Sequence, residues 1–307
     1  MSVRVEPAVI AVVGSTATGK SDLALHLARE LGGEIVNADA SQIYRGMNIG
    51  TAKLPFQQRQ GIEHHLLDFL DVSDEATVAA YQERATRTID ELLAAGTPVV
   101  LVGGSGLYVR AALDVLDIPP TDPQVRLAWE GRLAIEGVDA LHRRLATVDP
   151  RAAEAIGAFN GRRIVRALEV IQITGRPFSA SMPTRTYRHP TLQIGLRAER
   201  EVLQPRVVTR AHAMWAGGFL DEVRTLDGLG LRQGRTASRA IGYAQALRQL
   251  DGDLSQEEAI TETVLLTMRF ARRQRAWFRP DQRIQWLDHD DPQLAERASH
   301  LVHAVHP

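Results

Sequence analysis

The chain has 307 residues and a formal net charge of −1, with 44% hydrophobic and 24% charged residues. This composition is typical of a globular protein, and the near-neutral charge argues against wholesale coating of nucleic acid while leaving room for a local basic face. No apolar run approaches the ~20 residues that a membrane span needs, and residues 1–8 lack a signal-peptide core, so we expect a cytoplasmic protein with no membrane contact. The absence of cysteine excludes disulfides, thiolate metal sites and cysteine nucleophiles.

The first motif lies between a predicted strand and a predicted helix. Residues 9–13 are a short apolar, β-branched run typical of a buried parallel strand, and residues 21–31 place leucine and alanine on one helical face. Between them, every fixed position of the P-loop pattern G-x-x-x-x-G-K-[ST] is matched by the run Gly14, Ser15, Thr16, Ala17, Thr18, Gly19, Lys20 and Ser21. Backbone N–H groups and the lysine of such a loop bind phosphate, and its serine is placed to ligate Mg²⁺. The sequence therefore predicts a phosphorylated ligand at Lys20 and Mg²⁺ on Ser21.

A second strand is predicted over residues 34–38, and Asp39 follows at its C-terminal end. In a doubly wound sheet, ligand-binding and catalytic groups gather where the parallel strands end. Asp39 is therefore a candidate for the same site, and the polar segment 39–53 would line it, although a plain surface loop is the alternative. His64 and His65 follow, but adjacent side chains diverge and no third ligand is apparent, so we expect no metal there.

A third strand precedes a second glycine-rich turn. Residues 77–95 have the spacing of an amphipathic helix, and residues 97–102 form a strand that ends in the glycine-rich run 103–108. Glycine after a buried strand lets the backbone approach a ligand closely. The run differs from the common NTPase arrangement, in which the strand ends in an aspartate that orders magnesium.

A proline-dense segment at 116–123 indicates the boundary of an inserted lobe. The pattern within the lobe predicts helices at 124–137, 138–147, 149–159 and 162–174. A loop between Pro177 and Pro183 follows, and residues 191–196 return to strand character, so we expect the chain to rejoin the sheet. The remaining pattern predicts helices at 199–216, 220–226, 237–250 and 256–275, a strand at 284–287 and a polar tail.

These elements predict an α/β fold, a P-loop NTPase-like parallel sheet flanked by helices, with an inserted all-helical lobe. The predicted catalytic core comprises residues 1–120 and 191–307, and the predicted insertion comprises residues 121–190. We see no apolar stripe left over once a core is built, so we expect a monomer.

Arginine gathers at two places in a chain whose only lysines are Lys20 and Lys53. The first cluster, residues 162–166, lies on a predicted helix. The second, residues 269–279, interleaves arginine with aromatic side chains and contains no glutamate. Arginine with aromatic rings is the composition that binds phosphates and stacks unpaired bases, although a basic helix that packs through its aromatic side is the alternative. In a neutral chain, the clusters indicate one nucleic-acid face.

The chain resembles the tRNA dimethylallyltransferases, in their bacterial form, through an ordered set of motifs. Besides the P-loop, this set comprises residues 39–53, 64–68, 103–108, 163–176, 218–223, 240–243 and 272–279. The resemblance implies transfer of a dimethylallyl group from dimethylallyl diphosphate to the exocyclic N6 amine of the adenosine immediately 3′ of the tRNA anticodon. The product would be N6-isopentenyladenosine.

The resemblance also implies roles for particular residues. Lys20 and Mg²⁺ would stabilise the diphosphate leaving group, Asp39 would act as general base, and Ser105 would line the channel between amine and allyl group. The residues implied to bind the tRNA anticodon stem-loop are Asp39, Ala40, Ser41, Gln42, Ser105, Arg126, Asn160, Gly161, Arg162, Arg163, Ile164, Arg239, Gly242 and Tyr243.

Three positions depart from the family pattern. Ala40 stands where the family usually has serine, so the hydrogen bond expected there is missing or comes from Ser41. Ser105 replaces the usual threonine and keeps the hydroxyl, and Ala276 replaces a threonine before the tryptophan, which weakens only a detail on the tRNA side.

Three other functions remain open. A small-molecule or nucleoside kinase would bind ATP at the same loop, but it leaves the arginine–aromatic face unexplained. A nucleic-acid-binding P-loop protein without group transfer leaves Asp39 without a task. A prenyltransferase acting on free adenylate is disfavoured by the large insertion and the second arginine cluster.

Overall fold

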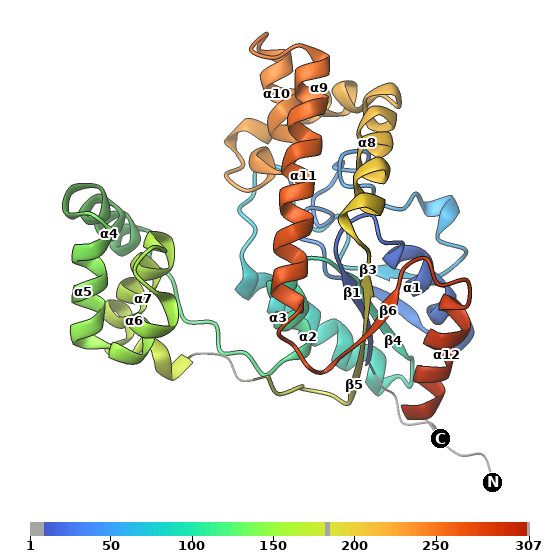
Figure 1. The fold of residues 1–307 in the computed structure, drawn as a ribbon, viewed down its shortest axis with the longest axis horizontal. Coiled ribbons are helices and arrows are strands. Elements are labelled where there is room, and N and C mark those ends of the chain that lie inside the picture. The colour runs from blue at the N-terminus through green and yellow to red at the C-terminus, as the bar shows by residue number, and fades with distance from the viewer. Residues whose placement is uncertain (1–8, 182–184, 306–307) are drawn as a thin grey trace. The chain divides into compact units, whose positions relative to one another are not determined.

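The computed structural model describes residues 9–181 and 185–305, and the chain divides into two compact units (Figure 1). The larger unit comprises Met1–Leu113 and Tyr187–Pro307, and the smaller comprises Asp114–Thr186. The smaller unit thus begins and ends a few residues before the predicted insertion 121–190. Pro183, predicted to bracket a loop, lies outside the described residues.

The larger unit is built on a parallel sheet with the strand order β3-β2-β4-β1-β5-β6. Its described strands are β1 (Val9–Gly14), β2 (Glu34–Asn37), β3 (His64–His65), β4 (Val99–Gly103), β5 (Thr191–Arg197) and β6 (Ile284–Asp288). The predicted α/β fold with an inserted helical lobe is confirmed. Sequence analysis missed the edge strand β3, because two residues are too few to show an alternating pattern.

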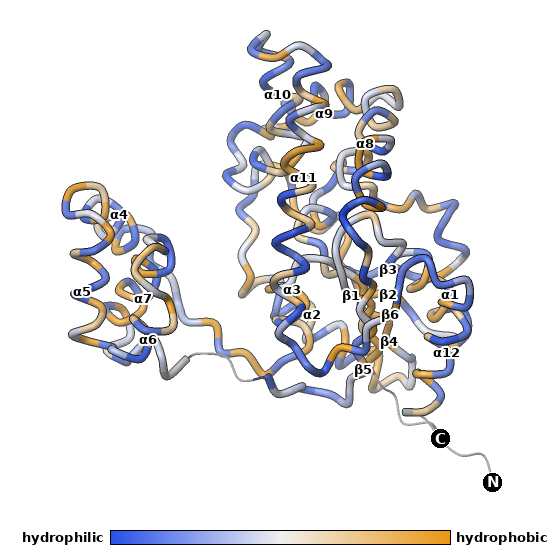
Figure 2. Tube along the Cα trace, viewed as in Figure 1, coloured by the Kyte–Doolittle hydropathy of each residue, from blue (hydrophilic) through white to orange (hydrophobic). Residues whose placement is uncertain are grey.

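Helices cover both faces of the sheet (Figure 1). On one face, α1 (Lys20–Leu31) and α12 (Leu294–Val305) bury Leu27 and Val302 against strand residues such as Ile194. On the other face lie α2 (Val78–Ala94) and α3 (Gly106–Leu113), which are joined by the stacked rings of Tyr81 and Tyr108 with centroids 4.3 Å apart. Figure 2 shows hydrophobic residues concentrated along the strands at the centre of this unit.

The polar tail predicted after the last strand is wrong over residues 294–305. Ala298 and Val302 are four residues apart and both buried, so they form the apolar face with which α12 packs on the sheet. Exposed polar residues of the helix, including Glu296, Arg297 and His300, dominated the sequence pattern. His303 and Ser299 bond Glu30 of α1, which fixes the helix further.

A group of helices lies beyond the carboxyl ends of the strands (Figure 1), namely α8 (Arg200–Ala216), α9 (Phe219–Gly228), α10 (Tyr243–Leu250) and α11 (Gln256–Phe278). Ring contacts of Phe219 with Trp215 and Tyr243, at 4.9 and 5.0 Å, join three of them. The single helix predicted over 237–250 is wrong. A short 3₁₀ turn, η4 (Ala237–Arg239), precedes α10, and Gly242 separates the two with φ +91°, a value that favours glycine. Other 3₁₀ turns are η1 (Phe56–Gln58), η2 (Phe178–Ser181) and η3 (Leu231–Gln233).

The smaller unit is helical and has its own core. Its helices are α4 (Pro123–Glu136), α5 (Val138–Val148), α6 (Pro150–Ile156) and α7 (Gly161–Thr174), with Leu141, Leu145, Ile164 and Leu168 buried between them. Asp122 and Asp149 each precede a proline and cap α4 and α6, because each aspartate accepts a backbone N–H of the first turn. None of the helices in the described ranges combines the length and hydrophobicity required to cross a lipid bilayer.

The packing of α12 can be tested by cavity formation. Val302→Ala removes buried methyl groups from the sheet face, so we expect the free energy of unfolding to fall by about 1–3 kcal/mol. Urea denaturation followed by circular dichroism measures this. His300→Ala, at an exposed position of the same helix, is the control and should change little. Equal stability of the two variants would contradict the packing.

Candidate active site

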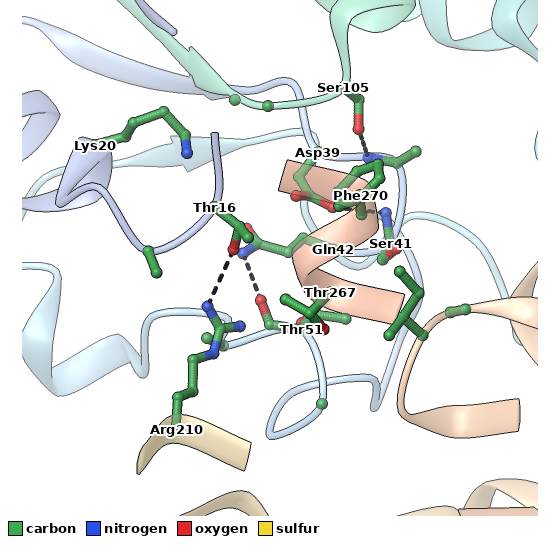
Figure 3. Close-up of a pocket in the computed structure, with 18 of the residues that line it drawn as sticks. Thr16, Lys20, Asp39, Ser41, Gln42, Thr51, Ser105, Arg210, Thr267 and Phe270 are labelled. Atoms are coloured by element: carbon green, nitrogen blue, oxygen red, sulfur yellow. Dashed lines mark hydrogen bonds between the residues drawn. The ribbon is translucent and has the colours of Figure 1, made fainter. Parts of the chain in front are cut away.

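Three loops leave the sheet at neighbouring carboxyl ends and line one cleft. They are the P-loop after β1, the Asp39 segment after β2 and the glycine-rich turn after β4, and they meet because β1 and β2 both pair with β4. The cleft measures about 510 Å³ and is closed by residues of α8, α11 and the η4 region. Lys20, Asp39 and Ser105, the predicted catalytic residues, all line it (Figure 3).

The P-loop has the backbone conformation of a phosphate-binding nest. Gly19, the N-cap of α1, has φ +84°, and Ala17 has φ +63°, so left-handed residues interrupt the turn as they do in anion-binding loops. Lys20 Nζ donates to the carbonyl of Ser15 at 2.5 Å, which keeps the ammonium inside the loop. The ammonium of Lys20 and the N-terminus of α1 therefore lie at the same loop, where both attract an anion.

Lys20, Arg210 and Asp39 interact electrostatically in the cleft. Burial lowers the pKa of the Lys20 ammonium to about 8, while Asp39 opposes this effect and Arg210 adds to it. Burial also lowers the pKa of the Arg210 guanidinium, which donates to Thr16 Oγ1 at 3.5 Å (Figure 3). Desolvated cations favour an anionic ligand, because such a ligand restores the interactions that the cations lose with water.

Asp39 is oriented by the backbone around it. Its Oδ1 accepts the N–H of Ser41 at 2.8 Å, and the N–H of Ala40 donates to Ser105 Oγ at 3.0 Å. The carboxylate points into the cleft beside Phe270 (Figure 3). The backbone of Ser41 and the hydroxyl of Ser105 therefore hold the turn that carries Asp39.

Glu222 of α9 anchors the segment that follows Asp39. Its carboxylate accepts the N–H of Ile49 at 2.7 Å and the hydroxyl of Tyr243 at 2.6 Å. Tyr243 is buried, and its burial raises the pKa of its phenol. Through its hydrogen bond to Glu222, the side chain supports the segment. Arg239 is exposed and lines the cleft, whereas Gly242 is buried. Among the predicted tRNA-binding residues that line the cleft, Arg239 therefore has the most accessible side chain.

Within the helical unit, the predicted tRNA-binding residues differ in exposure. Asn160 caps α7 and accepts the N–H of Arg163 at 3.2 Å, and the side chains of Arg162 and Arg163 are exposed. Ile164 is fully buried in the core of the unit, so its side chain has a packing role. Access to RNA therefore favours Arg162 and Arg163 over Ile164.

Arg126 is held by a buried carboxylate. Its Nε and Nη2 donate to Glu169 Oε2 at 3.0 and 2.8 Å, and Arg166 donates to the same oxygen at 2.9 Å. Glu169 is 0% exposed, so the pair joins α4 to α7 from inside the unit. A tRNA contact by Arg126 would have to form without breaking this pair, because a buried carboxylate left unpaired is strongly destabilising.

Sequence analysis missed several residues of the cleft. Arg210 lies in a predicted helix without a motif, and its role appears only once α8 is placed over the P-loop. The arginines of the cluster at 269–279 do not all face one cavity. Arg273 lines this cleft, whereas other members line a second cavity of about 540 Å³. A helix turns 100° per residue, so neighbouring arginines cannot all face one ligand. Glu199, distant in sequence, pairs with Arg275 at 3.2 Å.

Comparison with known proteins places this cleft in a family. The model of the family described as IPP transferase matches residues 42–281. The chain belongs to the IPP transferase family. The chain is 58% identical over 299 residues to the tRNA dimethylallyltransferase of Thermobifida fusca, covering 96% of this chain and 94% of the relative. It is 56% identical over 290 residues to that of Streptomyces avermitilis, covering 94% of this chain and 93% of the relative.

Solved structures agree. The tRNA isopentenylpyrophosphate transferase of Bacillus halodurans is 37% identical with a TM-score of 0.70, covering 97% of this chain and 96% of that one. A eukaryotic dimethylallyltransferase acting on tRNA is 26% identical with a TM-score of 0.84, covering 98% of this chain and 80% of that one. The IPP transferase fold thus extends over nearly all of this chain, and the predicted resemblance is confirmed.

The lowered pKa of Lys20 predicts how anion binding depends on pH. The protonated ammonium binds the anion, so affinity for inorganic diphosphate should fall by up to about tenfold per pH unit above pH 8, where the free protein loses this proton. Calorimetric titration at constant Mg²⁺ measures the affinity. Lys20→Arg is the matched control, because its guanidinium stays protonated and its profile reports only the ionisation of the ligand. Parallel profiles for both proteins would contradict the assignment.

Proposed function

We propose that this protein transfers a dimethylallyl group from dimethylallyl diphosphate to N6 of the adenosine immediately 3′ of the anticodon in tRNA. One observation carries the proposal: in a chain of the IPP transferase family, a P-loop lysine and the Asp39 carboxylate face the same cleft. The first suits an anionic leaving group and the second suits a nucleophile that must lose a proton.

The leaving group is held by the P-loop. Its backbone N–H groups, Lys20 and Arg210 surround the diphosphate and stabilise the charge that develops as the carbon–oxygen bond breaks. These groups are fixed before the reaction by the sheet and by α8, so little reorganisation accompanies the bond cleavage.

Magnesium fits the donor set at the start of α1. Ser21 offers a hard hydroxyl oxygen at an exposed position, and the described residues contain no group of three His, Cys, Asp or Glu side chains that could hold a metal alone. Mg²⁺ prefers such sites, where phosphate and water supply most ligands. Held by Ser21, it would add positive charge against the diphosphate.

The nucleophile is activated by Asp39. The carboxylate accepts the proton that the N6 amine loses as the new carbon–nitrogen bond forms. The bond from the N–H of Ser41 fixes the carboxylate, and Ser105 holds the adjacent backbone. The target base must leave the stack of the anticodon loop, at a cost of a few kcal/mol, so contacts elsewhere have to offset that cost.

The anticodon stem-loop is bound by exposed arginines. Arg239 at the cleft and Arg162 and Arg163 of the helical unit supply charge that attracts the phosphate backbone without sequence readout. We also propose that the protein acts as a monomer in the cytoplasm. A kinase that binds ATP at the P-loop is the alternative, and family membership disfavours it.

A single-turnover assay tests the reaction and the base together. The assay uses radiolabelled dimethylallyl diphosphate, Mg²⁺ and an anticodon stem-loop with adenosines at and around the target position. We expect label in the RNA, and a rate lower by about 10²-fold or more in Asp39→Ala, because the amine then lacks its proton acceptor. Absence of label in any tRNA, together with ATP consumption on a small-molecule acceptor, would favour the kinase.

The arginines of the helical unit should affect tRNA binding alone. In Arg162→Ala and Arg163→Ala, loss of a phosphate contact should raise the KM for tRNA several-fold and reduce the slope of log affinity against log salt by about 1 per contact. The KM for dimethylallyl diphosphate, measured in the same steady-state assay, serves as the internal control and should stay constant. An unchanged salt slope in both variants would argue against these contacts.

A further inference from the structure

A buried glutamine on α11 bonds two loops of the active site at once. Gln274 is 5% exposed. Its Oε1 accepts the backbone N–H of Thr16 at 2.9 Å, and its Nε2 donates to the carbonyl of Gly104 at 2.9 Å. These partners are 258 and 170 residues away in sequence. One side chain therefore joins the P-loop to the turn that carries Ser105.

The turn after β4 is shaped to receive α11. A Cβ added at Gly104 would lie 2.3 Å from Gln274 Nε2, and one added at Gly106 would lie 2.1 Å from Cδ1 of Trp277. Gln274 and Trp277 are three residues apart and so share a helix face. Ser105 lies between the two glycines. The position of Ser105 is therefore set by direct contact of its turn with α11.

We propose that Gln274 is a positioning residue, which fixes the P-loop and the diphosphate on it relative to Ser105, Asp39 and the amine of the target base. This inference rests on the proposed function. Displacement requires the nitrogen and the allylic carbon to approach within about 3–3.5 Å, and an error of about 1 Å can cost about 10²-fold in rate. The leaving group and the nucleophile are held by different loops, and Gln274 bonds one loop and the turn that supports the other.

The chemistry of the two bonds explains why an amide is required. One partner is an N–H donor and the other a carbonyl acceptor, and an uncharged amide satisfies both. A thioether satisfies neither, and an ionised carboxylate would face the carbonyl of Gly104 with a second acceptor. The backbone N–H of Thr16 donates to Gln274, so this donor of the P-loop holds the site together.

Gln274→Met tests the inference at nearly constant side-chain length. In the single-turnover assay at saturating substrates, we expect the rate constant to fall by about 10- to 100-fold through misalignment. Affinities for the stem-loop and for inorganic diphosphate should stay within about threefold, since the amide is buried and its bonds go to Thr16 and Gly104. Gln256→Met, at the exposed start of α11, is the control and should behave as wild type. A wild-type rate constant, or a loss confined to diphosphate affinity, would overturn the proposal.

Gln274→Glu gives a readout that a packing role would not produce. When protonated, the carboxyl can accept from Thr16 and donate to Gly104 as the amide does, whereas the ionised form cannot donate. The ratio of the variant's rate constant to that of wild type should therefore rise as the pH falls. A ratio independent of pH, in a protein that melts at the wild-type temperature, would overturn the proposal.

Gly104→Ala tests the same contact from the other side, since its Cβ displaces the Gln274 amide. The rate constant of the double variant Gly104→Ala, Gln274→Met should be no lower than that of the worse single variant, because both changes break one interaction. Fully multiplicative losses would overturn the proposal.

Failure of the proposed function is distinguishable from failure of this inference. Wild-type protein that labels no tRNA would contradict the function alone. Hydrogen exchange at the Thr16 amide then decides the inference without activity: exchange should be about tenfold faster in Gln274→Met, the factor equivalent to one lost hydrogen bond. Unchanged exchange would overturn it.

Discussion

Close approach of backbones at the carboxyl edge of the sheet is the constraint on which the site depends. A Cβ at Gly14, where β1 ends, would lie 2.5 Å from the carbonyl oxygen of Leu196, and one at Gly103, where β4 ends, would lie 2.3 Å from that of Ala38. Any other residue would therefore push β5 from β1 or β2 from β4. Since Asp39 follows Ala38, separation of β2 from β4 would carry the carboxylate away from Ser105.

The same compactness sets the charge state of the site. Lys20 and Arg210 are half-buried near the carboxylate of Asp39, which favours the charged form of both cations. The lowered pKa of Lys20 means that the folded chain holds this proton less tightly than the unfolded chain does, and burial of the ammonium therefore opposes folding below pH 8. The rest of the unit must offset that cost. What the protein gains is a site already charged and desolvated before an anion arrives, which is the arrangement that stabilises developing negative charge.

Sequence alone located the parts of the site whose pattern is local. The P-loop and Asp39 follow predicted strands directly, so motif and strand order were enough to bring them together. Arg210, Glu222 and Gln274 could not be found in this way. Their partners in the loops of the site are 170 or more residues away, and these contacts depend on how α8, α9 and α11 lie beyond the sheet. The predicted boundaries of the helix over 237–250 were wrong for a related reason. Gly242 reads as a tolerable residue within a helical pattern, and only its φ of +91° shows that the helix is broken.

The end of β4 explains how a phosphate-binding fold can suit a reaction other than phosphoryl transfer. In common P-loop NTPases a carboxylate near this place orders magnesium against a nucleotide. Here β4 ends in glycine and Ser105 follows, so the position contributes a neutral hydroxyl, and Asp39 comes from the neighbouring strand. In the proposed reaction, a carboxylate at the end of β4 would add negative charge near the diphosphate, and it would oppose departure of the leaving group. The carbonyl of Gly104, the next residue, accepts a hydrogen bond from the amide of Gln274, and in the proposed reaction the charge of Asp39 is left to accept the proton of the amine.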